Sequence, residues 1–158
     1  MTTKNSDLVA NFEATYTMSD AGLLTGTTRI AQGTVELAAG DSTDNDIVML
    51  APIPTNARIS SLKIGTDTFG SSCTFNVGLY TSAGVVKDED CFASSVADAA
   101  AMTDVRFEAA DISTAGQEVY TIAGDSTDPG GHYYVAATFN ATGGTAGTMS
   151  FIIEYVIN

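Results

Sequence analysis

Most of the chain after residue 26 consists of short runs in which large apolar residues alternate with polar ones. Clusters of Gly, Pro, Asn, Asp and Ser separate these runs. A period of two residues matches a β-strand that buries one face, and turn residues between such strands are typical of a β-sandwich or barrel. The pattern therefore predicts an all-β fold. The runs lie at residues 29–38, 46–51, 57–64, 73–81, 84–86, 104–109, 117–123, 132–139 and 148–156.

Some of these runs predict more than a strand. Every second residue from Cys73 to Leu79 is apolar, so we expect one face of that strand to be buried. The paired serines at 60–61 interrupt the alternation of their run and indicate a β-bulge or a change of register. Large apolar residues occupy both faces of 148–156, which predicts an internal strand with cover on both sides.

One stretch departs from the strand pattern. Residues 88–102 begin with three acidic side chains and continue with an Ala-rich sequence. Ala favours helix, and acidic side chains stabilise the first helical turn through the helix dipole. We expect a short helix here that crosses between strands.

The N-terminal part of the chain has a different character. Residues 1–26 are polar, mixed and without a clear period, so we expect an extended N-terminal arm. Residues 27–158 then form a single β-sandwich domain of about eight strands. Leu8, Phe12 and Tyr16 are the candidate partner contacts of the arm, because apolar side chains exposed on an arm are hard to explain without a partner.

The charge balance limits the partners. The 158 residues include 19 acidic and 6 basic side chains, for a formal net charge of −13. The basic residues are scattered singly, whereas nucleic-acid binding needs clustered Lys and Arg. We see no apolar segment long enough to cross a membrane and no signal peptide. We therefore expect no nucleic-acid partner, no membrane partner and synthesis in a cytoplasm, where Cys73 and Cys91 remain thiols.

Acidic residues gather in two loops that share the peptide AGDSTD, at 39–44 and 123–128. Asp and Ser side chains bond to nearby backbone and Gly allows positive φ, so both copies are predicted to be turns. Carboxylates at this density could also hold calcium, although neither loop has the spacing of a calcium-binding loop motif. Turn capping is our first interpretation, no cofactor is expected, and the alternative is a calcium site on these residues: Asp41, Asp44, Asp46, Asp125 and Asp128.

The sequence offers little for catalysis. The single histidine, His132, begins a strand-like run, and there is no Gly-x-Ser-x-Gly elbow. Ser60 and Lys63 have the Ser-x-x-Lys spacing, but that motif acts on a helix and here it lies in a strand pattern. We therefore expect a protein that is not an enzyme, with no catalytic residues.

Sugar binding is the alternative function. The chain has no Trp, yet tyrosines could supply a modest aromatic platform. A carbohydrate- or receptor-binding module is thus the second hypothesis, and a calcium-stabilised adhesion domain is the third. The tyrosines considered for the platform are Tyr80, Tyr120, Tyr133 and Tyr134.

A resemblance rests on residues 33–69 followed by 75–86, with GGHYYVAATF and TMSFIIEYV closing the pattern. A strand, a polar turn and a second strand lead into "Pro, small, Asn-Ala-Arg-Ile" at 54–59 and then "Val-Gly-Leu-Tyr" at 77–80. Over about residues 30–157 the chain resembles the decoration or cement proteins of tailed bacteriophages, which are auxiliary proteins of the head.

The resemblance implies a jelly-roll-like antiparallel sandwich and an oligomer, taken as a homotrimer because capsid lattices offer three-fold sites. It implies the major capsid protein as partner and the exterior of the virion as location, after synthesis in the host cytoplasm. The implied function is to bind the outer surface of the capsid and stabilise the shell, with many weak contacts acting together. With the same resemblance, the carbohydrate- or receptor-binding alternative would be a module of a head fibre or tail.

Overall fold

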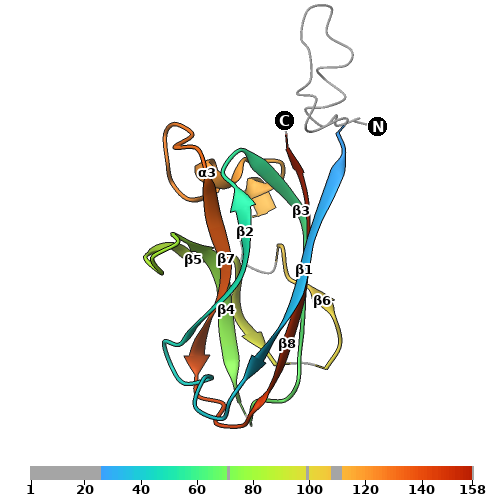
Figure 1. The fold of residues 1–158 in the computed structure, drawn as a ribbon, viewed down its shortest axis with the longest axis vertical. Coiled ribbons are helices and arrows are strands. Elements are labelled where there is room, and N and C mark those ends of the chain that lie inside the picture. The colour runs from blue at the N-terminus through green and yellow to red at the C-terminus, as the bar shows by residue number, and fades with distance from the viewer. Residues whose placement is uncertain (1–25, 71, 99, 108–111, 158) are drawn as a thin grey trace, which may run out of the picture.

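Two antiparallel sheets pack face to face in the computed structural model, which describes residues 26–70, 72–98, 100–107 and 112–157 (Figure 1). The predicted all-β sandwich is thereby confirmed, with four strands in each sheet. The first sheet has the order β1 (Thr28–Leu37), β8 (Gly147–Ile157), β3 (Ala57–Thr66) and β6 (Thr103–Asp104). The second has the order β2 (Ile47–Pro54), β7 (His132–Ala141), β4 (Thr74–Tyr80) and β5 (Val86–Ala97).

The core lies between the sheets and follows the alternation in the sequence. Phe75, Val77 and Leu79 on β4 are at most 1% exposed, as the period-two pattern predicted. Each buried side chain of this size contributes about 1.5–3 kcal/mol of hydrophobic stabilisation. Phe139 on β7 packs edge-on against Phe69, with ring centroids 5.5 Å apart, in the favoured geometry for an aromatic pair.

Two further strand predictions are confirmed. β8 is internal, with β1 on one side and β3 on the other. The register between β3 and β8 shifts between Ile59 and Ser61, where the paired serines predicted it. Ser60 is the extra residue of this bulge, and its hydroxyl donates to the Glu154 carbonyl on β8 at 3.1 Å.

The helix predicted at residues 88–102 is wrong, because most of this stretch belongs to strand β5. Phe92, Ala93 and Val96 are buried in the core, so pairing with β4 outweighs the helix propensity of the Ala-rich sequence. The strand is irregular: β5 advances from Asp88 to Ala93 while β4 passes only from Leu79 to Val77. The extra residues form a wide bulge, which we call the β5 bulge.

Within the described residues, the helical turns lie after β6. A 3-10 turn, η1 (Ile112–Thr114), precedes the run at 117–123. That run was predicted to be a strand but forms one short helix, α3 (Val119–Ile122). Val119 and Ile122 are both buried, and their spacing of three residues suits one helical face rather than one strand face. In the run at 104–109, of which the structure describes 104–107, Asp104 is the end of β6 and the other described residues lie outside strands.

Some predictions fall on residues that the structure does not describe. The N-terminal arm and its candidate contacts Leu8, Phe12 and Tyr16 lie in 1–25, outside the described residues. The division into an arm at 1–26 and a domain at 27–158 therefore stays a prediction. Within the described residues, no helix has the length and apolar character needed to span a bilayer.

Candidate functional site

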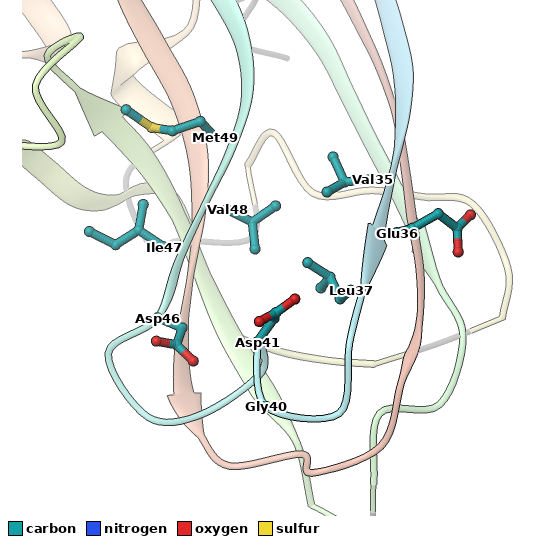
Figure 2. A pocket seen from close by; sticks show the side chains of 9 residues that line it. All are labelled: Val35, Glu36, Leu37, Gly40, Asp41, Asp46, Ile47, Val48 and Met49. Atoms are coloured by element: carbon teal, nitrogen blue, oxygen red, sulfur yellow. The ribbon is translucent and has the colours of Figure 1, made fainter.

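A groove opens where one edge of the first sheet faces one edge of the second. β1 and β2 are the edge strands there, and the groove between them has a volume of about 520 Å³ (Figure 2). It lies at the end of the sandwich where β1 finishes and β2 begins. The residues that line it are Val35, Glu36, Leu37, Gly40, Asp41, Asp46, Ile47, Val48 and Met49.

The inward side of β1 is incompletely covered. Ala31, Gly33 and Val35 are only half-buried, and Leu37 alone among the inward residues of β1 is buried. The Phe151 ring on β8 lies against Gly33, and the groove opens beyond it, at Val35 and Leu37. These two side chains face Val48 across the gap (Figure 2).

Acidic side chains stand around this apolar interior. The Asp41 carboxylate points into the lower part of the gap, whereas Glu36 points away from it on the other side of β1 (Figure 2). Asp46 lies at the start of β2, and hydrogen bonds from the Thr43 hydroxyl and backbone N–H lower the pKa of its carboxyl. The groove thus combines hydrophobic walls with negative charge, and none of the described residues that line it is Lys or Arg.

The aspartates proposed as calcium ligands occupy two distant loops. Asp41 and Asp46 line the groove, and Asp44 belongs to the same loop between β1 and β2. Asp125 and Asp128 belong to the loop between α3 and β7, and α3 lies at the opposite end of the sandwich (Figure 1). Among the described residues no three His, Cys, Asp or Glu side chains come together in a group that could hold a metal ion. The calcium site stays an untested alternative.

Most of these aspartates cap turns. Asp41 accepts from the Ala38 N–H at 2.9 Å, and Asp128 accepts from the Gly130 N–H at 2.8 Å. Both copies of AGDSTD form turns, in agreement with the sequence-based interpretation. The second copy, however, follows helix α3 rather than a strand.

Asp125 belongs to a polar cluster that the sequence did not reveal. Its carboxylate accepts from Lys87 Nζ on β5 at 2.8 Å and from the Tyr133 hydroxyl on β7. These two hydrogen bonds lower the pKa of the Asp125 carboxyl. The Lys87 ammonium also lies 5.3 Å from the centre of the Tyr133 ring. The cluster joins three separate segments at one end of the second sheet.

The tyrosines do not assemble into an exposed platform for sugar. Tyr80 is 1% exposed and Tyr133 is 9% exposed, so both belong to the core. Tyr120 is partly buried and packs against that core. The hypothesis of a carbohydrate-binding module thereby loses the feature on which it was based.

The residues considered for catalysis lie apart or serve the fold. His132 is exposed at the start of β7, paired with Pro54 on β2. Ser60 bonds to the β8 backbone, and Lys63 lies 3.7 Å from Glu154 Oε1 in a partly exposed ion pair. Whether the protein has an enzymatic activity stays a prediction from the sequence.

A buried arginine is the second feature that the sequence did not reveal. Arg106 is 1% exposed, and burial lowers the pKa of its guanidinium. The guanidinium lies 4.9 Å from the ring centre of Phe92, which belongs to the β5 bulge. It donates to the Ile59 carbonyl at 3.2 Å and to the Thr114 carbonyl at 3.1 Å. Arg106 therefore connects the β5 bulge, strand β3 and turn η1.

Comparison with known proteins shows a shared fold. No family model and no curated protein matches this sequence. A chain in the capsid asymmetric unit of cyanophage Pam1 matches over 100% of both chains, with 16% identity and a TM-score of 0.58. A chain in the capsid of Ralstonia phage GP4 matches over 84% of this chain and 86% of its own, with 16% identity and a TM-score of 0.61. The fold of this chain is thus similar to that of chains found in two phage capsids.

Proposed function

We propose that this protein is a structural component of a bacteriophage virion that binds the outer surface of the capsid and stabilises the shell. The observation that carries the proposal is the fold similarity to a chain of the cyanophage Pam1 capsid, which extends over the whole of both chains.

The charge of the chain favours a position outside the shell. A net charge of −13 opposes contact with packaged DNA, because phosphate binding requires basic side chains. The partner in this proposal is the major capsid protein, and the chain binds as a homotrimer at three-fold sites of the lattice. Repeated copies then stabilise the shell through many weak contacts.

Co-sedimentation with phage heads tests this function. Purified protein is mixed with heads of the phage whose genome encodes it, after any resident copies have been stripped, and the pellet is assayed for bound protein. Saturable binding, together with greater resistance of the heads to heat, supports the proposal. Protein that stays in the supernatant at all concentrations contradicts it.

Light scattering tests the oligomeric state separately. We expect the solution mass to be three times the chain mass of 16.3 kDa, with and without a chelator. A monomeric mass contradicts the homotrimer but leaves the capsid-binding function open to the sedimentation test. A mass that falls when chelator is added supports the calcium-dependent alternative instead.

A further inference from the structure

The groove between β1 and β2 has the backbone features of a site for strand addition. Among the described residues, β1 pairs only with β8 and β2 pairs only with β7. Each strand therefore presents a row of unpaired backbone N–H and C=O groups on its free side. An extended segment from another protein can bond to such an edge and continue the sheet.

The interior of the groove selects the side chains of that segment. In an added strand, alternate side chains point inward, where Val35, Leu37 and Val48 form an apolar surface (Figure 2). The lining takes three consecutive residues from each of the two strands, which corresponds to about 10 Å of extended chain. A short apolar-alternating segment therefore fits the groove.

The negative charge around the groove favours basic residues among the outward side chains of the added segment. Glu36, Asp41 and Asp46 belong to the lining, which contains no basic residue. The whole chain is also strongly acidic, so its field attracts cationic segments over a longer range. Basic residues between the apolar positions of the added strand complement these carboxylates.

We propose that the groove between β1 and β2 binds an extended segment of a partner protein as an added strand, with apolar residues at alternate positions and Lys or Arg between them. Only the identity of the partner, a capsid subunit, rests on the proposed function. The backbone edge supplies affinity, the apolar walls fix the register, and the carboxylates select a basic sequence.

A synthetic peptide tests the chemistry of the groove without a capsid. The probe is an acetylated and amidated hexapeptide of alternating Lys and Val, titrated into the full-length protein and followed by amide NMR. We expect saturable shifts confined to residues 35–37 and 46–49. Two control peptides, alternating Lys with Ser and Glu with Val, are expected to bind at least about ten-fold more weakly. Equal binding of the Lys-Ser peptide would mean that charge alone attracts the probe, and the proposal would be wrong.

Matched variants on β1 locate the binding. Val35→Lys places a cation in the groove and is expected to weaken binding of the Lys-Val peptide about ten-fold or more. Ile30→Lys makes the same change on the same strand at a side chain that is 60% exposed and outside the lining, so binding should stay within about two-fold. Val35→Thr keeps the shape of the side chain, serves if the lysine variant does not fold, and should weaken binding about three-fold. Equal binding by all three variants overturns the proposal.

The same variants separate this proposal from the proposed function. If the wild-type protein binds heads and Val35→Lys binds them equally well, the groove proposal fails and the capsid function stands. If the wild-type protein does not bind heads but does bind the Lys-Val peptide, the function fails and the chemistry of the groove stands. A drop in the solution mass of the protein on Val35→Lys alone would identify a second copy as the occupant, which overturns the proposal of a basic partner segment.

Discussion

Lys87 on β5 and Asp125 after helix α3 form an ion pair, with Nζ and Oδ1 2.8 Å apart. The Tyr133 hydroxyl donates to the other oxygen of the same carboxylate. This carboxylate thus binds two partners from different strands and holds the loop after α3 against the second sheet. The hydrogen bond to Asp125 also raises the pKa of the Lys87 ammonium.

This cluster predicts a specific dependence of stability on pH. Since the pKa of Asp125 is lower in the folded protein, its contribution to the free energy of unfolding is complete above the ordinary Asp pKa and is lost as pH falls through the lowered value. Asp125→Asn should therefore be less stable than wild type at neutral pH, and the difference should shrink in acid. Urea unfolding of both proteins from neutral to acidic pH measures this. A difference that stays constant with pH would show that the charge on Asp125 does not contribute.

Removal of the Arg106 guanidinium should destabilise the protein strongly. Arg106→Ala removes the guanidinium hydrogen bonds to the Ile59 and Thr114 carbonyls and opens a space beside Phe92. We expect a loss of about 3 kcal/mol in the free energy of unfolding. Arg29→Ala, at an exposed position on β1, is the matched control and should change stability by less than about 0.5 kcal/mol. Similar urea midpoints for the two variants would contradict the role of Arg106.

Gly78 should tolerate no side chain, because the β5 bulge lies directly over it. A Cβ at this position would approach the Asp88 carbonyl oxygen to 2.1 Å and the Glu89 carbonyl carbon to 2.3 Å. Both atoms are backbone, so Gly78→Ala must displace the bulge, at an expected cost of about 3 kcal/mol. Gly40→Ala adds the same methyl group where no atom lies within 4 Å and should be neutral. Thermal unfolding of the two variants distinguishes steric overlap at Gly78 from a general effect of replacing glycine.

Both cysteines should be unreactive in the folded protein. Cys73 is 1% exposed, and burial raises the pKa of the Cys73 and Cys91 thiols, so little reactive thiolate forms at neutral pH. A coloured thiol reagent should label neither residue quickly in buffer and both of them in denaturant. A reducing agent should leave the melting temperature unchanged, because both thiols are free. Fast labelling of the native protein would contradict the burial of these thiols.

The two-residue alternation of apolar side chains correctly predicted strands that bury one face. The alternation from Cys73 to Leu79 was sufficient to predict β4 and its buried face. The apolar residues of 148–156 correctly predicted an internal strand, but only the inward face of β8 is buried, so the predicted cover on both faces was wrong. The helix prediction for residues 88–102 was wrong because pairing with β4 outweighed the local preference for helix. That pairing is a contact between separate segments, which local propensity does not indicate. The strand prediction for residues 117–123 was also wrong, because one turn of helix buries Val119 and Ile122 together on the same face.

The groove could not be predicted, because it depends on strand order. Val35 and Val48 belong to runs that were recognised as strands, but nothing in either run indicates that both strands lie at edges on the same side of the sandwich. Arg106 was missed for a similar reason. A single arginine between Val105 and Phe107 resembles a solvent-exposed residue until the chain brings Phe92 and Thr114 around it.

The free edges of β1 and β2 also affect how the protein behaves at high concentration. Open strand edges are templates for pairing between identical copies, and mutual repulsion is one means of keeping such copies apart. This repulsion comes from a net charge of −13 and disappears as the pH approaches the isoelectric point near 4.1. The acidic composition therefore opposes self-association of a fold whose β1 and β2 edges are open, and we expect self-association to increase as the pH falls toward the isoelectric point.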